Sequence, residues 1–432
     1  MTHSSFEALS IAGPILRSLH EEGYTQPTEV QRNAIPFALS GKDVLAVAPT
    51  GTGKTAAFTI PILQHLSRKP AGDRRPIRAL ILTPTRELAL QVQEAITAYG
   101  RHLSLHSTVV MGGVNMNPQI KAVRRGVDVL VATPGRLLDL MQQGHVKLDQ
   151  VEFFVLDEAD RMLDMGFIHD VRKIASRVPA KRQTLFFSAT MPGAVAELAN
   201  SLLKEPVRVE VTQATAAANR PNIEQRLMFV GNADKQNLLA HLLQSNRDGH
   251  MLVFARTKHR ADKIVRKLQQ VGVRSGAIHS NKTQSQRQRT LADFAEGRIR
   301  VLIATDLVAR GIDVDGITHV INYDLSDEPE NHVHRIGRTA RAGASGKAIS
   351  FCDPDELSKL RQIEKLAGAP IEVDENQPYH HAQAARQRQE RTVSVQKKSG
   401  GFQPARGPRQ PRWQKARGKS RPQRSRRQPV TA

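Results

Sequence analysis

The sequence predicts an α/β protein with two tandem parallel-sheet domains, a short linker and a disordered basic C-terminal tail. The chain has 432 residues, of which 39% are hydrophobic, so it is long enough to bury two separate cores. Apolar, β-branched runs alternate with helical patterns in both halves, as in parallel sheets with crossover helices. The last segment is rich in Arg, Gln, Pro and Gly and has almost no aliphatic residues.

The first domain is expected over residues 1–211 and the second over residues 223–376. Five apolar runs that predict buried strands in the first domain are 44–50, 79–85, 127–134, 152–158 and 184–190. Five more in the second domain are 251–257, 275–280, 301–306, 319–324 and 347–352. The stretch 212–222 between them has little periodicity and is the predicted linker. We expect the chemistry to lie between the two domains.

The predicted tail, residues 377–432, carries most of the excess positive charge. It holds 15 Lys and Arg residues against the single acid Glu390, which is +14 of the chain's +22. Such a segment cannot bury enough apolar surface to offset the entropy of ordering, so it is expected to be disordered. Its cations suit RNA phosphates, and Phe402 and Trp413 suit stacking on bases. The alternative is a solvated tail that only keeps the protein in solution.

Other features of the composition exclude several classes of protein. Cys352 is the single cysteine, which excludes a disulfide scaffold and a cysteine-rich zinc site. The N-terminal residues MTHSSFEALS do not resemble a signal peptide, and no apolar run is long enough to cross a bilayer. The cytoplasm is therefore the expected location, without a membrane partner.

A predicted phosphate-binding loop follows the first apolar run. Its residues are Ala48, Pro49, Thr50, Gly51, Thr52, Gly53, Lys54 and Thr55. The pattern is close to G-x-x-x-x-G-K-[ST], with Ala in place of the first Gly. Gly51 and Gly53 allow backbone amides to face phosphates, Lys54 would neutralise them, and the Thr55 hydroxyl would bind Mg²⁺. A chance glycine-rich turn is the alternative, but the strand before and the helix after the loop favour a nucleotide site.

Two acids follow the apolar run Phe153–Leu156 in the manner of a Walker B strand. At the end of that strand Asp157 can hold Mg²⁺, and Glu158 can orient or deprotonate the attacking water. Two acids alone are also common where a helix begins. Together with the upstream loop they predict an NTPase that uses ATP and Mg²⁺, with Lys54, Asp157 and Glu158 as catalytic residues.

The run Asp157-Glu158-Ala159-Asp160 resembles the signature of the DEAD-box ATP-dependent RNA helicases of superfamily 2. The resemblance extends over about residues 6–346 and implies two RecA-like domains that act on RNA. Upstream, Gly23, Tyr24, Pro27, Thr28 and Gln31 resemble the family's Q motif, with Phe6 further upstream. This implies that the Gln31 carboxamide recognises adenine and that Phe6 stacks on the ring.

Three further motifs of the first domain match the family's RNA-binding motifs. The implied RNA contacts are Pro84, Thr85, Arg86, Gly113, Thr133, Pro134, Gly135 and Arg136. Their hydroxyl, guanidinium and amide groups suit phosphate contact. Each motif taken alone would more often be an ordinary strand-to-helix turn. Ser188 and Thr190 resemble the motif that couples hydrolysis to unwinding, which implies hydroxyl hydrogen bonds toward Asp160 and toward the second domain.

The second domain carries the remaining motifs. The resemblance implies RNA contacts for Gln284, Arg287 and Thr305, a ribose contact for Asp313, and a coupling role for His334. Residues 334–341 match the family's arginine motif. Arginines near one strand end, in a chain with a phosphate-binding loop, are candidate arginine fingers. Arg335 and Arg338 are therefore predicted to be catalytic. A correctly placed arginine finger increases the rate of hydrolysis about 10³–10⁵-fold, and here it would act once the domains close. A patch for RNA alone is the alternative.

One position departs from the family pattern, because Ala340 stands where the family usually has glycine. If that position needs a positive φ, alanine costs about 1 kcal/mol, so the rate and not the role is in question. Within the family, residues 126–140 and 157–174 look most like the bacterial RhlE branch.

The predicted function is hydrolysis of ATP to ADP and phosphate, with local unwinding of short RNA duplexes or remodelling of ribonucleoproteins. The expected partner is structured or double-stranded RNA, bound largely without regard to sequence. Ribosome-assembly intermediates or an RNA-decay nuclease are further expected partners. The alternatives are an ATP-gated RNA clamp or scaffold, a DNA translocase and a P-loop kinase. The kinase gives no reason for the motifs of the second domain.

Overall fold

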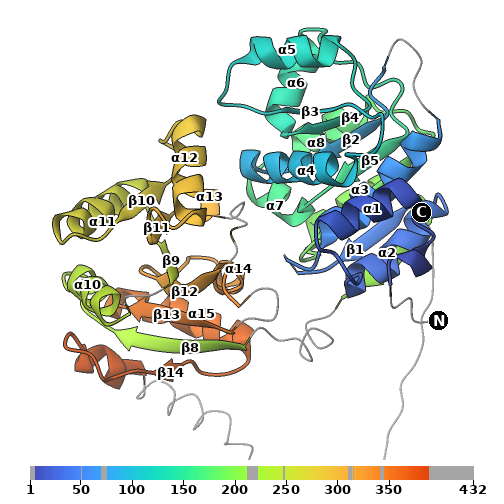
Figure 1. Cartoon of the computed structure of the whole chain (residues 1–432). Helices are drawn as coiled ribbons and strands as arrows, with labels where there is room; N and C mark the ends of the chain where they lie inside the picture. The colour runs from blue at the N-terminus through green and yellow to red at the C-terminus, as the bar shows by residue number, and fades with distance from the viewer. Residues whose placement is uncertain are drawn as a thin grey trace, which may run out of the picture. The chain divides into compact units, whose positions relative to one another are not determined.

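The structure is a computed structural model, and it describes residues 5–49, 51–69, 75–211, 222–246, 249–309, 314, 316–340 and 345–388. Two seven-stranded sheets organise the chain, and all strand pairs within both are parallel (Figure 1). We call residues 5–211 the first lobe and residues 222–385 the second lobe. The predicted α/β class with two tandem parallel-sheet domains is confirmed.

The first sheet has the strand order β3-β4-β2-β5-β6-β1-β7. Its strands are β1 (Val44–Val47), β2 (Ala79–Leu82), β3 (Ser107–Val110), β4 (Val129–Ala132), β5 (Phe153–Leu156), β6 (Gln183–Ser188) and β7 (Val207–Glu210). The helices are η1 (Glu7–Leu9), α1 (Gly13–Glu21), α2 (Glu29–Leu39), α3 (Lys54–Arg68), α4 (Arg86–Tyr99), α5 (Met116–Arg124), α6 (Pro134–Gln142), α7 (Ala159–Asp164), α8 (Ile168–Ala175) and α9 (Gly193–Leu202).

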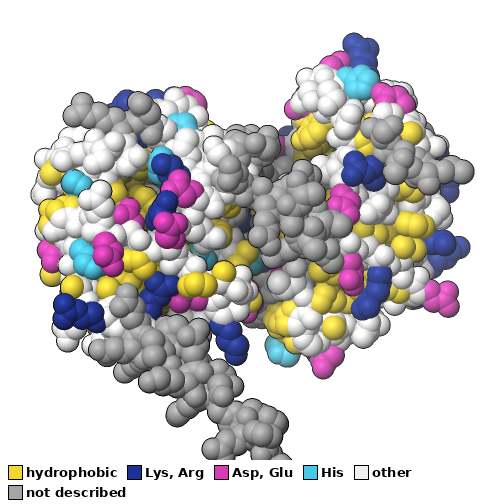
Figure 2. Space-filling view, turned by 90° about the horizontal axis from the view of Figure 1, so that it is seen from below, with side chains coloured by type: hydrophobic (Ala, Val, Ile, Leu, Met, Phe, Trp, Pro, Cys, Tyr) yellow, Lys and Arg dark blue, Asp and Glu magenta, His cyan; other side chains and the backbone are white. Residues whose placement is uncertain are grey.

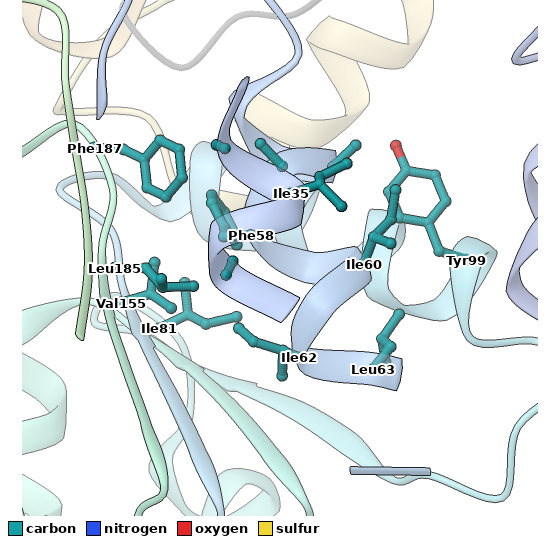
Figure 3. Close-up of a cluster of buried hydrophobic side chains, with 14 of the residues drawn as sticks. Ile35, Phe58, Ile60, Ile62, Leu63, Ile81, Tyr99, Val155, Leu185 and Phe187 are labelled. Carbon is teal, nitrogen blue, oxygen red and sulfur yellow. The ribbon is translucent and has the colours of Figure 1, made fainter. Parts of the chain in front are cut away.

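Helices cover both faces of this sheet, which explains why its strands are continuous apolar runs. Residues on one face pack with α1 to α4, and Figure 3 shows Phe58 of α3 beside the strand residues Val155 and Leu185. The neighbouring residues Phe154 and Phe186 point to the opposite face and pack with α6 to α9. Each such buried side chain contributes about 1.5–3 kcal/mol, so the two cores hold the strand ends in place.

The second sheet has the order β10-β11-β9-β12-β13-β8-β14. Its strands are β8 (Asn222–Phe229), β9 (His250–Phe254), β10 (Ser275–Ile278), β11 (Val301–Ala304), β12 (Ile317–Asn322), β13 (Ser345–Cys352) and β14 (Glu372–Val373). The helices are α10 (Lys235–Ser245), α11 (Lys258–Gln270), α12 (Gln284–Ala295), α13 (Asp306–Ala309), α14 (Pro329–Ile336), η2 (Pro354–Glu356) and α15 (Leu357–Ala367). Cys352 is fully buried at the end of β13.

The ordered part of the second lobe extends beyond the expected boundary at residue 376. Gln377 Nε2 donates to Phe229 O at 3.0 Å, and His380 forms an antiparallel bridge with Val230. Residues 382–388 are helical, and Ala384 is fully buried. The structure therefore does not support a disordered tail that begins at residue 377. The expected tail from residue 389 onward lies outside the described residues, as does the expected linker apart from Asn222, which begins β8.

Two features of the described residues bear on other classes of function. It contains no helix long and apolar enough to cross a membrane, and no cluster of three or more His, Cys, Asp or Glu side chains that could hold a metal ion by themselves. In the view of Figure 2, Lys and Arg side chains alternate with Asp and Glu side chains, and no large face of one sign is visible. That mixture agrees with a charge excess that the sequence assigns mainly to the C-terminal residues.

Candidate nucleotide and RNA site

The phosphate-binding loop connects β1 to α3, as expected. Gly51 and Gly53 have φ values of +80° and +87°, a region that side-chain-bearing residues rarely adopt. Lys54 begins α3, is 7% exposed, and its ammonium donates to Ala48 O at 2.9 Å. Thr50 lies outside the described residues. The loop therefore has the backbone geometry of a phosphate site, with a cation and a helix N-terminus beside it.

The Q-motif residues contact this loop directly. Thr28 Oγ1 donates to Thr52 O at 2.7 Å, and Gln31 Nε2 donates to Gly53 O at 3.1 Å. Gln31 Oε1 accepts from Thr28 N at 2.9 Å, which completes a capping box at the start of α2. A Cβ on Gly53 would lie 2.4 Å from Gln31 Nε2, so only glycine fits here. In this conformation the carboxamide is engaged by the loop and the helix cap, whereas the sequence predicted a contact with adenine. The T-x-x-Q spacing is the signal for the cap that sequence reasoning missed.

Phe6 is fully buried in the core beside Leu9 and Ile15. The expected stacking of its ring on adenine is not supported in this conformation, because no face of the ring is accessible. The ring instead anchors the segment before α1 to the first lobe. Its apolar neighbours at Leu9 and Ile11 give the sequence signal for a core residue.

Asp157 lies directly after β5 and is 2% exposed. Its backbone N–H donates to Leu82 O at 3.0 Å, which continues the β2–β5 ladder to the edge of the sheet. Burial raises the pKa of the Asp157 carboxyl to about 7, while the nearby Lys54 charge opposes the shift. A buried carboxyl of this kind is stabilised by a cation. Asp157 and the Thr55 hydroxyl therefore fit Mg²⁺ carried by a nucleotide.

Glu158 has a strained backbone, with φ +52° although it is not glycine. Its side chain is nearly buried, with Oε2 3.5 Å from Arg161 Nε. That oxygen accepts no hydrogen bond from the residues that the structure describes. Strain of about 1–3 kcal/mol persists where the surroundings impose it, and such positions cluster at active sites. The Glu158 carboxylate therefore has an oxygen that can accept a hydrogen bond from a water molecule.

Asp160 connects the DEAD segment to the residues after β6. Thr190 N and Thr190 Oγ1 each donate to Asp160 Oδ2 at 2.9 Å. Ser188 Oγ accepts from Asp160 N at 3.2 Å and donates to Thr190 O at 2.7 Å. Burial raises the pKa of Asp160, but the hydrogen bonds from Thr190 and the Lys54 charge outweigh it and hold the pKa below its usual value. The hydrogen bonds toward Asp160 that the resemblance implies are confirmed, whereas those toward the second domain stay a prediction.

The predicted RNA motifs of the first lobe meet around the loop after β3. The Arg86 guanidinium lies against Gly113, where a Cβ would be 2.0 Å from Arg86 Nη1 and φ is +75°. Arg136 Nη1 donates to Val114 O at 3.2 Å. Two guanidinium groups from different motifs thus converge on one short loop. A positive, glycine-lined surface of this kind suits a nucleic-acid backbone.

Other predicted RNA residues also begin helices at the carboxyl ends of strands. Pro84 and Thr85 follow β2, and Thr85 Oγ1 caps α4 by accepting from Leu88 N at 3.3 Å. Thr133 follows β4 and is the N-cap residue of α6, in which Pro134 and Gly135 form the first turn. In the second lobe, Thr305 follows β11, and Gln284 and Arg287 lie at the start of α12. Asp313 lies outside the described residues.

Arg335 requires a correction. Its Nε and Nη2 donate to the two oxygens of Asp306 at 2.5 and 2.7 Å, and Nη1 donates to Asp324 O at 2.7 Å and Asn322 Oδ1 at 3.2 Å. The guanidinium also lies 4.9 Å from the Phe254 ring centre and is 3% exposed. Four of its five donors are engaged within the second lobe. The structure therefore does not support the expectation that Arg335 reaches a phosphoryl group.

Arg338 and Ala340 lie just beyond α14. Arg338 Nε donates to the carbonyl of His334, the other predicted residue of this motif, at 3.3 Å. Ala340 has φ +55°, so the condition under which alanine is strained at this position is met. Of the two predicted arginine fingers, Arg338 stays the candidate, because four of the five Arg335 donors are engaged within the second lobe. Arg341, the third arginine of the motif, lies outside the described residues.

Comparison with known proteins agrees with this geometry. Residues 28–198 match the DEAD/DEAH box helicase family, and residues 234–343 match the helicase conserved C-terminal domain. The chain is 40% identical over 371 residues to the DEAD-box ATP-dependent RNA helicase CshA of Geobacillus kaustophilus, which covers 85% of this chain and 78% of that protein. The chain belongs to the DEAD-box RNA helicase family. DEAD-box helicases hydrolyse ATP with Mg²⁺ and act on RNA, so this chain is an RNA-dependent ATPase and helicase by family.

Two further DEAD-box relatives define the extent of the similarity. DEAD-box ATP-dependent RNA helicase 30 of Arabidopsis thaliana is 43% identical over 364 residues, which are 84% of this chain but 61% of that protein. The chain thus spans less than two thirds of that relative. The structure of S. cerevisiae Dbp5 bound to RNA and ADP BeF3 has a TM-score of 0.76 and 32% identity, and covers 86% of this chain and 95% of that one. The two RecA-like lobes are therefore the shared helicase core.

Proposed function

We propose that this DEAD-box protein uses ATP binding to grip the backbone of one RNA strand and ATP hydrolysis to release it. A short duplex would lose pairing locally while the strand is held. One observation carries the proposal: Asp160, next to the Walker B acids, accepts two hydrogen bonds from Thr190 in the motif that follows β6. A nucleotide-dependent change at the acids therefore has a direct path to the neighbouring loop.

The nucleotide roles follow from the first lobe. Lys54 would bind phosphate oxygens, and Thr55 and Asp157 would hold the Mg²⁺ that neutralises charge on the phosphates. Glu158 would orient the attacking water, because its carboxylate is nearly buried and has an oxygen without a hydrogen-bond donor. Arg338 would supply positive charge from the second lobe, and Arg335 would hold the arginine motif in place. Gln31 would hydrogen-bond to the phosphate-binding loop as well as to adenine.

The RNA contacts would be mainly to phosphate and ribose. Arg86 and Arg136 both lie at the loop that follows β3, where their guanidinium groups would face phosphate oxygens. Contact of this kind supports binding without sequence preference and selection of RNA through its shape and 2′-hydroxyl groups. Structured or double-stranded RNA would then be the substrate.

The finer assignments are also proposals. The helicase domains would comprise residues 1–211 and 223–385, joined by the linker, and residues 389–432 would tether structured RNA. That segment has 13 Lys and Arg residues against Glu390, a net charge of +12. We further propose a cytoplasmic protein of the RhlE branch that acts on ribosome-assembly intermediates or with an RNA-decay nuclease. The basic C-terminal segment and residues 157–174 support the branch.

Strand displacement on a short RNA duplex tests the function. ATP should release the displaced strand, and a non-hydrolysable analogue should support at most a single round. An ATP-gated clamp would instead bind RNA in an ATP-dependent manner without displacement. Competition between RNA and DNA strands of one sequence distinguishes a helicase for RNA from a DNA translocase, because only the former discriminates against DNA.

A further inference from the structure

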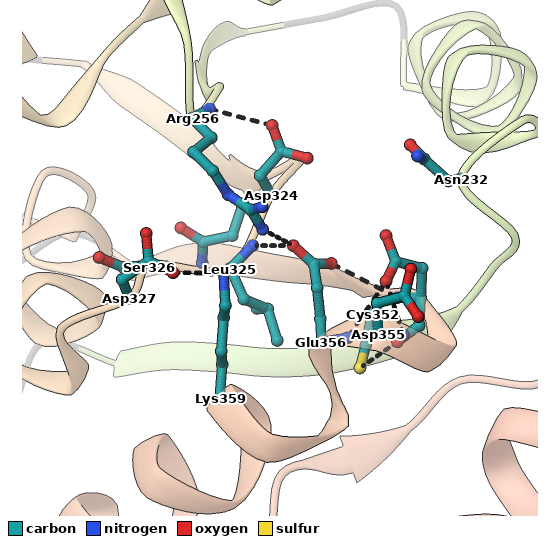
Figure 4. Close-up of polar contacts among 12 residues, drawn as sticks. Asn232, Arg256, Asp324, Leu325, Ser326, Asp327, Cys352, Asp355, Glu356 and Lys359 are labelled. Atoms are coloured by element: carbon teal, nitrogen blue, oxygen red, sulfur yellow. Dashed lines mark hydrogen bonds and ion pairs between the residues drawn. The ribbon is translucent and has the colours of Figure 1, made fainter.

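The second lobe contains an ionic cluster with a buried centre and two more exposed arginines, Arg256 and Arg260, that none of the nucleotide or RNA motifs accounts for. It consists of Lys235, Arg256, Arg260, Asp324, Asp353 and Glu356, and we call it the Lys235 cluster. Lys235 and Asp324 are fully buried, and Glu356 is 2% exposed. Three cations face three carboxylates, so the cluster is balanced in charge. Figure 4 shows Arg256 between Asp324 and Glu356.

Lys235 is the centre of the cluster. Its ammonium lies 2.6 Å from Glu356 Oε2, 3.0 Å from Asp353 Oδ2 and 3.4 Å from Asp324 Oδ1. Arg256 Nη2 lies 2.6 Å from Glu356 Oε1, and Arg260 pairs with Asp324. The three hydrogens of the ammonium thus match three carboxylates from two segments of the chain, Asp324 after β12 and the Asp353 and Glu356 pair at η2.

The cluster joins the carboxyl ends of three neighbouring strands. Arg256 N, just after β9, donates to Asp324 Oδ2 at 2.9 Å. Leu325 N, just after β12, donates to Glu356 Oε1 at 3.1 Å, and Asp353 directly follows β13. Lys235 begins α10 and inserts between them. The main chain at Asp324 is therefore fixed from several sides.

Asp324 connects the cluster to the arginine motif. Its side chain belongs to the cluster, and its carbonyl oxygen accepts from Arg335 Nη1 at 2.7 Å. Arg335 lies in the last turn of α14, three residues before Arg338. A shift of the Asp324 carbonyl would thus move Arg335 and, with it, the end of α14 and the residues just beyond it, which include Arg338.

Stability alone is a weak reason for such a cluster. Desolvation of buried charges often cancels their attraction, and well-packed apolar side chains of similar volume are often at least as stabilising. Hydrogen-bonded ion pairs fix both the orientation and the separation of the side chains that form them. A site that acts on a phosphoryl group needs its arginine in place within a fraction of an ångström.

We infer that Lys235 is a positioning residue for ATP hydrolysis, acting through Asp324 and Arg335 on Arg338. The inference rests on the proposed role of Arg338. Because Lys235 is fully buried, its side chain is out of reach of nucleotide and RNA, so its loss should change the rate of hydrolysis and leave ground-state binding alone.

The test compares steady-state ATP turnover at saturating RNA in Lys235→Met, Lys235→Arg and Leu360→Ala, each corrected for the folded fraction. Met keeps the length of the side chain without the charge. Leu360 is a fully buried residue of α15 and controls for general destabilisation of the same lobe. We expect Lys235→Met to lower kcat at least tenfold with KM for ATP within twofold, Lys235→Arg to restore part of it, and Leu360→Ala to keep kcat. Equal kcat in Lys235→Met and wild type, or an equal loss in Leu360→Ala, would overturn the inference.

Two further variants keep the inference separate from the proposed function. Arg338→Ala should abolish turnover; if it does not, the arginine-finger role fails. Arg335→Lys combined with Lys235→Met should lose little more than the more damaging single variant, because both act along one path. Losses that multiply would contradict that path. If Lys235→Met does not fold, Asp324→Asn, which keeps the volume and the carbonyl, replaces it with the same expected loss of kcat.

Discussion

Replacing Ala340 by glycine tests the backbone geometry at the end of the arginine motif. Ala340 has φ +55°, where an L-residue with a side chain costs about 1–2 kcal/mol relative to glycine. The substitution also loosens the unfolded chain and removes a buried methyl group. Both effects lower the stability of the fold, and both accompany any buried Ala→Gly change. The difference between this variant and an Ala→Gly change in a right-handed helix therefore reports the backbone strain alone. Ala261, fully buried in α11, is that control.

We expect Ala340→Gly to be more stable than Ala261→Gly by about 1–2 kcal/mol, because only the first change relieves strain. Cys352 supplies the assay, since it is the chain's single cysteine and is fully buried at the end of β13. Burial raises the pKa of its thiol, so labelling in urea reports unfolding of the second lobe. Equal losses of stability in the two variants would refute the reasoning, since the left-handed backbone at Ala340 would then carry no cost.

Three further predictions follow from single sites. Burial and the Arg335 charge lower the pKa of His332 to about 4, so the fold keeps it neutral. The second lobe should therefore lose about 1 kcal/mol between pH 7.5 and 5.5, and His332→Gln should lose less; an unchanged pH slope would contradict this. Gly113→Ala should displace the Arg86 guanidinium and weaken RNA binding about tenfold without changing ATP affinity, whereas Gly193→Ala, where a Cβ meets nothing within 4 Å, should bind RNA normally. Deleting 389–432 should reduce RNA affinity and its salt dependence while maximal RNA-stimulated turnover stays nearly intact; an unchanged salt slope would exclude the tail as an RNA tether.

The sequence was most informative where one pattern has one structural solution. Continuous apolar runs followed by Gly-x-Gly-Lys-Thr or by Asp-Glu predicted strands that end at one edge of a sheet, and the structure has β1 and β5 there. Ala340 was also informative, because its departure from a glycine position identified a place where a positive φ would strain the backbone, and the structure has φ +55° there. These features depend on local chemistry, so a single sequence is enough to find them.

The sequence was less informative where a side chain has two possible partners. Arg335 was expected at the nucleotide, but Asp306 and Asp324 engage it within its own lobe. Those partners come from other strand ends, and only the folded sheet brings them together. Phe6 was expected at adenine and is a core residue. The polar composition after residue 376 predicted no ordered structure there, but the side-chain amide of Gln377 donates to the carbonyl of Phe229 at the end of β8.

The Lys235 cluster shows the same limit. Lys235, Asp324 and Glu356 are far apart in the sequence and belong to no nucleotide-binding pattern. Charged residues are mostly exposed, so the sequence gives no reason to expect Lys235 in the core. The buried charge becomes visible only when α10, β12 and η2 are assembled.

The most direct test of the account is ATP turnover with and without single-stranded RNA, in the wild-type protein and in Glu158→Gln. The account predicts strong stimulation by RNA in the wild type. It also predicts that Glu158→Gln abolishes turnover while ATP-dependent RNA binding is kept, because the amide fills the same space without accepting a proton from water. Turnover that is indifferent to RNA, or that survives in Glu158→Gln, would contradict the coupling of ATP hydrolysis to RNA through the Walker B acids.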